Sequence, residues 1–303
     1  MIPFIDLKTQ QRQIRSKIDE RIKKVLDHGQ YILGPEVKEL ENELGRFTDA
    51  KYVLCCSSGT DALLLALLGL KLKPGDGVIV PSFTFASSAE VMPLLGAIPI
   101  FIDVEADTFN LDPEKLNETL ETANEMGINV KGIMSVGLFG QPANMNAIKE
   151  FAAKNNLWVI DDAAQSFGGK YNNQMVGNLC EVTATSFFPA KPLGCYGDGG
   201  AIFTNNKEIY EIANSSHVHG MGNNRYEYDR IGMNARMSTI QAAILLEKLA
   251  IFPDELKKSK PAIATADVEL IRKVITYYIK KSSPPNKELE EKLLSLYHRV
   301  GRL

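Results

Sequence analysis

The chain has 303 residues, 45% of them hydrophobic, and a formal net charge of −3. Such a chain can bury a large core, which suggests one large domain plus a smaller piece. The small net charge gives no global field that would recruit nucleic acid or a membrane surface. No apolar stretch has the length of a membrane span, and the N-terminus lacks the apolar region of a signal peptide.

Four cysteines are present, and they do not show the spacing of a metal site. Cys55 and Cys56 are adjacent within an apolar run. We therefore expect buried free thiols in a reducing compartment, and hence a cytoplasmic protein.

Strands and helices are expected to alternate along most of the chain. Helical spacing predicts an amphipathic helix over 10–26, and Gly34-Pro35-Glu36 opens a second helix. Apolar strands alternating with helices predict an α/β sheet covered on both faces. The expected strands are 52–56, 77–80, 98–102, 132–136, 157–160, 183–188 and 200–204, with helices at 61–70, 87–95 and 145–153.

The last part of the chain differs in charge. From Lys257 onward it has eleven Lys and Arg but only five Asp and Glu. Apolar residues at helical spacing on both sides of Ser282-Ser283-Pro284-Pro285 predict a helical hairpin that packs on the main body or on a partner subunit. Nucleic-acid binding by these basic helices is the alternative, but nothing else in the chain requires it.

Lys191 is the candidate catalytic residue. It lies in the run Ser186-Phe-Phe-Pro-Ala-Lys-Pro-Leu-Gly194, and Gly197-Asp-Gly-Gly200 follows. Most lysines are solvated, but a lysine enclosed by Pro, Gly and aromatic residues must emerge from a rigid loop. That setting suits an amine that forms a Schiff base with a carbonyl compound.

Asp161 and Asp162 end an expected buried strand, where a carboxylate needs a partner. The protonated ring nitrogen of pyridoxal phosphate (PLP) is one such partner. A metal ion is the rival explanation. However, adjacent residues on an extended chain point to opposite faces, so these two would not chelate one ion together.

Two further segments follow expected strands. Ser57-Ser58-Gly59-Thr60-Asp61 leads into a helix, where backbone N–H groups and the helix dipole can bind an anion. A Ser or Thr there is more often only a cap. Phe85 in Pro81-Ser-Phe-Thr-Phe85 could stack on a flat cofactor, although most such rings belong to the core.

Together these motifs resemble the DegT/DnrJ/EryC1/StrS aminotransferases, which aminate nucleotide-linked keto sugars. Asp161-Asp-Ala-Ala-Gln165, Asn234-Ala-Arg-Met237 and Ile240-Gln-Ala-Ala243 also match, and the resemblance runs from about Phe4 to about Leu256. It implies a three-layer α/β/α PLP-transferase type I large domain over 1–256, with a mostly parallel sheet. The tail 257–303 then stands in place of the usual small domain as a short helical segment. Within the family, His28 to Val37 and Lys191 to Gly197 are most similar to enzymes that aminate a UDP-linked 3-keto-2-acetamido-glucuronate for O-antigen and related surface polysaccharides.

The resemblance also implies roles for individual residues. Lys191 becomes the Schiff-base lysine, and Asp162 the partner of the ring nitrogen. An arginine that faces a uronate carboxylate has an independent rationale, because the guanidinium fork matches a carboxylate. The remaining roles are Gln165 at the cofactor's 3-hydroxyl, Phe85 as stacking ring, Gly59, Thr60 and Ser186 at the phosphate, Asn234 at the neighbouring subunit's phosphate, and Gly29, Tyr31 and Arg236 at the sugar nucleotide.

Three functions are compatible with such a site. The leading one is transfer of an amino group from L-glutamate to a keto sugar by a homodimer with shared active sites. The second is a sugar dehydratase, a relative in which histidine replaces the lysine, and Lys191 argues against it. The third is a PLP-binding remnant or regulator without turnover, which the missing small domain and its absent His-Tyr-Pro segment keep open. No metal is expected.

Overall fold

The computed structural model describes residues 7–224 and 226–258. A seven-stranded sheet has the order β1-β9-β8-β5-β4-β2-β3. Adjacent strands are parallel except in the pairs β1–β9 and β8–β9, so β9 runs antiparallel to the other six strands of this sheet. The strands are β1 Tyr52–Cys56, β2 Asp76–Pro81, β3 Ile98–Ile102, β4 Asn129–Val136, β5 Trp158–Asp162, β8 Val182–Ser186 and β9 Gly200–Thr204, with a separate hairpin β6 Lys170–Tyr171 and β7 Gln174–Met175.

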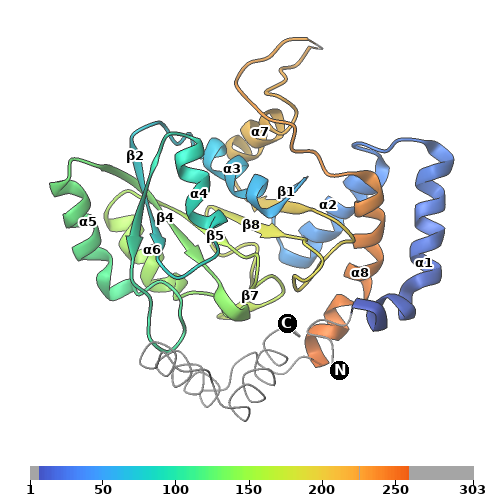
Figure 1. Ribbon diagram of the computed structural model, residues 1–303, viewed down its shortest axis with the longest axis horizontal. Helices are drawn as coiled ribbons and strands as arrows, with labels where there is room; N and C mark the ends of the chain where they lie inside the picture. The colour runs from blue at the N-terminus through green and yellow to red at the C-terminus, as the bar shows by residue number, and fades with distance from the viewer. Residues whose placement is uncertain (1–6, 225, 259–303) are drawn as a thin grey trace, which may run out of the picture.

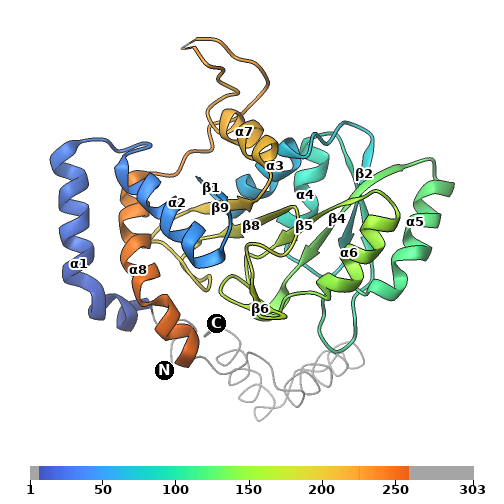
Figure 2. The same cartoon turned by 180° about the vertical axis from the view of Figure 1, so that it is seen from behind.

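Helices cover both faces of this sheet (Figures 1 and 2). Helices α3, α4 and α7 pack on one face, whereas α5 and α6 cover one half of the other face and α2 with α8 the rest. The result is a three-layer α/β/α arrangement, as predicted. The helices are α1 Leu7–His28, α2 Pro35–Thr48, α3 Gly59–Gly69, α4 Ser87–Leu94, α5 Leu116–Glu125, α6 Met145–Lys154, α7 Lys207–Ser216 and α8 Thr239–Lys258, with 3-10 turns η1 Pro113–Lys115 and η2 Leu138–Gly140.

The strands feed two cores because successive side chains point to opposite faces. In β1, Leu54 and Cys56 pack under α3 and α7, whereas Val53 and Cys55 pack under α2 and α8. All four cysteines are free thiols, and Cys180 is only partly buried. This agrees with the expected free thiols, three of which are buried.

Helix α1 lies at the edge of the molecule and packs on α8 (Figure 1). Ile14 and Ile18 contact Ile244 of α8 in a small apolar cluster. Since α8 also packs on α2, these three helices form one unit beside the sheet.

Helix α8, Thr239–Lys258, includes the predicted domain boundary at Leu256, and Lys258 is the last residue that the structure describes. The predicted helical hairpin of the basic tail lies outside the described residues. Within the described part of the chain, none of the helices combines the length and the apolar character needed to cross a membrane.

A group of stacked aromatic rings fills the core beneath α2 and α8. Phe167 is 2% exposed and stacks on Phe203 and Phe252, with ring centroids 5.5 and 6.2 Å apart. Phe47 lies 5.7 Å away and Phe187 6.2 Å away. Phe167 is therefore the ring on which this core is built.

We expect Phe167→Ala to lower the free energy of unfolding by ~3–5 kcal/mol, because it removes buried apolar surface and leaves a cavity. Phe101 on the edge strand β3 is 59% exposed, and Phe101→Ala should change it by less than about 1 kcal/mol. Urea unfolding followed by circular dichroism measures both. Similar losses in the two variants would contradict the assignment of Phe167 to the core.

Candidate active site

The carboxyl group of Asp162 lies at the carboxyl end of β5 and is buried at 6% exposure. Ser88 Oγ donates a hydrogen bond of 2.8 Å to Oδ2, and the Ala164 N–H donates one of 3.1 Å to Oδ1. Burial raises the pKa of Asp162, and these hydrogen bonds and Lys191 oppose the rise. A cationic ligand atom beside this carboxyl would lower its pKa and so favour its ionised form.

Asp161 points to the opposite face of the strand. It is fully buried, Ser135 Oγ donates to its Oδ1 over 3.3 Å, and its Oδ2 has no hydrogen-bond partner. Burial, together with the neighbouring Asp162, raises the pKa of Asp161 to about 7. The two carboxyls thus have different surroundings and do not face a common ion.

Lys191 lies in the loop between β8 and β9, and its side chain is partly buried. Burial lowers the pKa of Lys191, while the nearby Asp162 carboxylate works against that shift. A lowered pKa increases the fraction of neutral amine, which is the form that attacks a carbonyl group. The structure therefore brings Lys191 near enough to Asp162 for the two charges to affect each other.

Helix α8 holds the end of this loop. Gln241 Oε1 accepts a 2.8 Å hydrogen bond from the Tyr196 N–H, and Gln241 Nε2 donates to Tyr196 O over 3.3 Å. At the loop's base, the Phe187 N–H donates to Gly199 O and the Cys195 N–H to Phe187 O, each at 2.7 Å. These contacts fix the loop from which Lys191 emerges.

The first turn of α3 lies against the end of β8. A Cβ atom on Gly59 would lie 2.6 Å from Ser186 Cβ, so only glycine allows this approach. Ser58 caps the helix by accepting the Asp61 N–H at 3.0 Å, and Thr60 Oγ1 lies 3.0 Å from Ser87 Oγ. Free N–H groups and small hydroxyl residues at a helix N-terminus are suited to a phosphate.

Phe85 is linked to Asp162 through Ser88, and Gln165 lies three residues after Asp162 in the chain. The Phe85 carbonyl accepts a 3.1 Å hydrogen bond from the N–H of Ser88, the residue that also contacts Asp162. The Phe85 ring is 69% exposed, which differs from the core position that most such rings take. Gln165 Oε1 accepts the Phe139 N–H at 3.0 Å, so its NH2 group is the end that can donate to a ligand.

The predicted substrate residues form a second group. Arg236 Nε donates to Asn234 Oδ1 over 2.9 Å, and Arg236 pairs with Cys56 in an isolated bridge. Tyr31 lies beside the same segment, since its carbonyl accepts the Thr239 N–H at 2.9 Å. Gly29 follows the last residue of α1 with a positive φ of 71°, which glycine adopts without strain.

The two groups meet just before α3, where the Ser57 N–H donates to Ala235 O over 2.9 Å. Ser88 and Gln241 have positioning roles that the sequence does not predict. Ser88 acts through its hydrogen bond to Asp162, which is 74 positions further along the chain, so no local sequence pattern indicates this role. Gln241 lies in a motif that was recognised, but its partner Tyr196 is visible only in the fold.

The arrangement fits PLP. Asp162 could supply the buried carboxyl for a ring nitrogen and Lys191 the amine. The α3 N-terminus could bind the phosphate, and Phe85 has an exposed ring that could stack on the cofactor. Comparison with known proteins agrees: residues 12–287 match the model of the DegT/DnrJ/EryC1/StrS aminotransferase family. The chain belongs to this family. Its aminotransferases depend on PLP, and the matched region extends beyond the boundary predicted at Leu256.

Three proteins illustrate the similarity. The UDP-2-acetamido-2-deoxy-3-oxo-D-glucuronate aminotransferase of Pseudomonas aeruginosa is 48% identical over 89% of this chain and 73% of its own length. The crystal structure of a family member from Brucella abortus matches with a TM-score of 0.85 and 46% identity, over 90% of this chain and 74% of that one. NtdA from Bacillus subtilis, solved with bound cofactor PMP, matches with a TM-score of 0.78 and 28% identity, over 99% of this chain and 65% of that one.

Asp161→Asn tests the protonation of the buried pair. The folded protein binds this proton more tightly than the unfolded chain, so wild-type stability is lost as pH rises from about 4 to about 7. The variant lacks this loss. Its free energy of unfolding relative to wild type should therefore rise by roughly 2–3 kcal/mol between about pH 5 and about pH 8. Urea unfolding of both proteins without cofactor measures this, and a pH-independent difference would contradict it.

Proposed function

We propose that this chain moves an amino group from L-glutamate to the keto group of a nucleotide-linked sugar. The observation that carries the proposal is the pair of Lys191 and the buried Asp162 carboxyl, beside a helix N-terminus suited to a phosphate. In this proposal each predicted cofactor and substrate residue has the role that the family resemblance implies for it.

The acceptor that we favour is a UDP-linked 3-keto-2-acetamido-glucuronate. The 48% identical Pseudomonas aeruginosa relative has a name that describes this activity. Arg236 supports the choice, because a guanidinium can bind a uronate carboxylate through two hydrogen bonds. The product would supply surface polysaccharide such as the O-antigen of lipopolysaccharide, and four free thiols fit a cytoplasmic location.

When bound, PLP supplies an electron sink for the negative charge that develops at the reacting carbon. Asp162 holds the ring nitrogen protonated, and the hydrogen bonds from Ser88 and Ala164 fix the carboxyl in place. Lys191 Nζ takes and returns the proton at the reacting carbon, and its lowered pKa favours this because more of the amine is neutral.

A homodimer with shared sites is part of the proposal. The segment after α7 projects from the body (Figure 1) and bears exposed apolar side chains, including Ile231 at 92% and Tyr228 at 58%. Such side chains fit a protein interface better than water. Asn234 follows on the same segment and would reach the phosphate of the neighbouring subunit.

A PLP-binding regulator or remnant without turnover is the second candidate. It is favoured by a 39% identical relative from Geobacillus stearothermophilus, which is named a pleiotropic regulatory protein. Addition of L-glutamate to the PLP-loaded protein separates the two. Loss of the cofactor's absorption band supports transamination, and an unchanged band supports the regulator.

Lys191→Ala should abolish covalent attachment of PLP, because Lys191 is the single lysine in the loop between β8 and β9. Borohydride reduction of the loaded wild type, followed by peptide mass spectrometry, should place the label on the peptide that contains Lys191. Lys149, whose Nζ donates to Leu179 O over 2.8 Å, provides a control lysine: Lys149→Ala should keep the label. A label that persists in Lys191→Ala would refute the assignment.

Arg236→Ala should weaken binding of UDP-glucuronate by ~2–5 kcal/mol, because it removes the partner of a desolvated carboxylate. Binding of UDP-N-acetylglucosamine, which lacks this carboxylate, should change much less. Calorimetric titration of both ligands measures the difference. Equal losses would show that Arg236 does not contact the uronate.

Mixing two impaired variants tests the shared site. Lys191→Ala lacks the reactive amine, and Asn234→Ala lacks the group that would bind the neighbouring subunit's phosphate. In a mixed dimer of these subunits, one site receives an intact lysine from its own subunit and an intact asparagine from the partner. Refolding an equal mixture should restore about one quarter of wild-type activity, given random pairing of a twofold dimer. No gain over Asn234→Ala alone, although differently tagged subunits co-purify as mixed dimers, would place both residues in the same subunit's site.

A further inference from the structure

The turn between α1 and α2 exposes three consecutive apolar side chains. Tyr31, Ile32 and Leu33 are 49%, 48% and 47% exposed, and Leu33 has a positive φ of 53°. Apolar packing therefore contributes little to holding this turn, and its backbone bonds must do so.

One end of the turn is bound to the segment that carries Arg236. The Thr239 N–H donates to Tyr31 O over 2.9 Å, and the Gly34 N–H donates to Thr239 Oγ1 over 3.0 Å. Ile32 and Ser238 form an isolated bridge between these two bonds. The position of Tyr31 is thereby tied to that of Arg236, three residues before Thr239.

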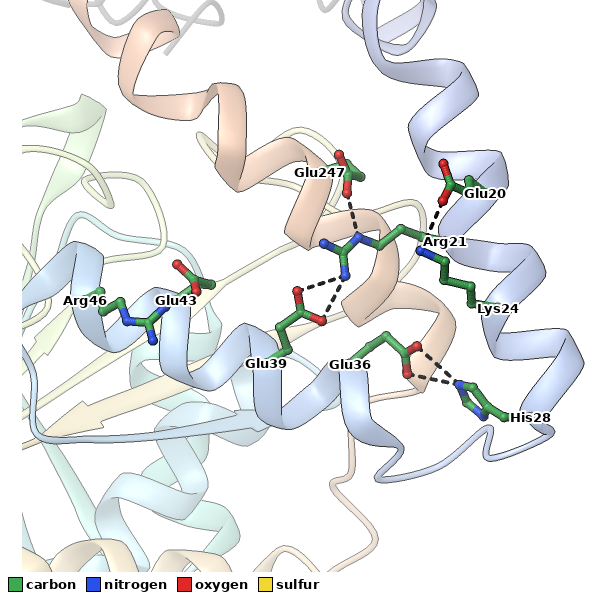
Figure 3. Close-up of polar contacts among 9 residues, drawn as sticks. All are labelled: Glu20, Arg21, Lys24, His28, Glu36, Glu39, Glu43, Arg46 and Glu247. Atoms are coloured by element: carbon green, nitrogen blue, oxygen red, sulfur yellow. Dashed lines mark hydrogen bonds and ion pairs between the residues drawn. The ribbon is translucent and has the colours of Figure 1, made fainter.

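The other end is bound by His28, the last residue of α1. His28 Nδ1 lies 3.0 Å from the Gln30 backbone nitrogen and accepts its N–H. Nε2 lies 3.2 and 3.3 Å from the two carboxylate oxygens of Glu36, on α2 (Figure 3). Because Nδ1 must keep its lone pair to accept a hydrogen bond, the proton is on Nε2, which donates to Glu36.

Helix α1 presents His28 from a fixed position. Arg21 lies two helical turns before His28 on the same side of the helix (Figure 3). Its Nε donates to Glu247 of α8 over 2.6 Å, and its Nη1 donates to both oxygens of Glu39 on α2 over 2.9 Å. The end of α1 is thus held against both helices.

From this geometry we infer that His28 is a positioning residue for the substrate. Its Nδ1 holds the Gln30 N–H and so sets the path of the next residue, Tyr31, against the segment of Arg236. The contact with Glu36 only anchors the ring. The inference rests on the proposed function, in which Tyr31 and Arg236 bind the sugar nucleotide.

Two substitutions separate the two ring nitrogens. The side-chain oxygen of asparagine occupies the place of Nδ1, so His28→Asn keeps an acceptor for Gln30 but loses the bond to Glu36. The side-chain nitrogen of glutamine reaches the place of Nε2, so His28→Gln keeps the bond to Glu36 but loses the acceptor. His28→Ala loses both, and Glu36→Gln keeps an acceptor for Nε2.

The experiment is calorimetric titration of the PLP-loaded full chain with UDP-glucuronate, together with steady-state kinetics. His28→Gln and His28→Ala should weaken binding and raise KM roughly 3- to 10-fold, as expected for one lost hydrogen bond. His28→Asn and Glu36→Gln should stay within about 2-fold of wild type, and kcat should change little in all four variants. Thermal midpoints and the PLP absorption band check that each variant is folded and loaded.

Two outcomes overturn the inference while the proposed function stands. One is wild-type affinity in both His28→Gln and His28→Ala. The other is an equal loss in His28→Asn and His28→Gln, which would show that the acceptor at Nδ1 has no special role. If wild type itself does not bind UDP-glucuronate, the proposed function fails and the inference falls with it.

Discussion

The constraint on which the site depends is the burial of a carboxyl group at the carboxyl end of a central strand. Asp162 occupies this place, and two hydrogen bonds do not fully offset its desolvation, since its pKa remains raised. The parallel order of β4, β5 and β8 brings their carboxyl ends to one edge, so the loop with Lys191 begins next to this carboxyl. An amine and a cationic ring nitrogen are the groups that such a carboxyl stabilises.

Most of the sheet could be predicted from the sequence, because buried strands are short apolar runs bounded by polar or turn residues. β1, β3 and β9 have the predicted bounds. Helices α5 and α7 were not predicted. Each is only 10 residues long and has few apolar residues, so its helical spacing extends over too short a stretch to stand out in the sequence. Helix α8 was missed for the opposite reason: it packs between α1 and α2 and is apolar on more than one side.

The chemical residues of the site were easier to predict than those that hold them. Lys191 and Asp162 stand out because an amine in a rigid loop and a carboxyl at the end of an apolar strand are unusual locally. Ser88 and Gln241 act through residues far along the chain, so their roles appear only in three dimensions. The assignment of individual residues to cofactor and substrate stays a prediction until the variants are measured.

The pairing of β1 with β9 has a consequence for how the chain folds. Tyr52 pairs with Thr204 and Cys56 with Gly200. Strand β1 can therefore pair only after β9, about 150 residues later in the chain, has been synthesised. During synthesis the edge of β1 has no strand partner until β9 has left the ribosome, and closing so long a loop is slow. The exposed edge and its apolar neighbours are prone to aggregate in that interval. We therefore expect the yield of folded protein to depend on translation rate and chaperones more strongly than its final stability would suggest.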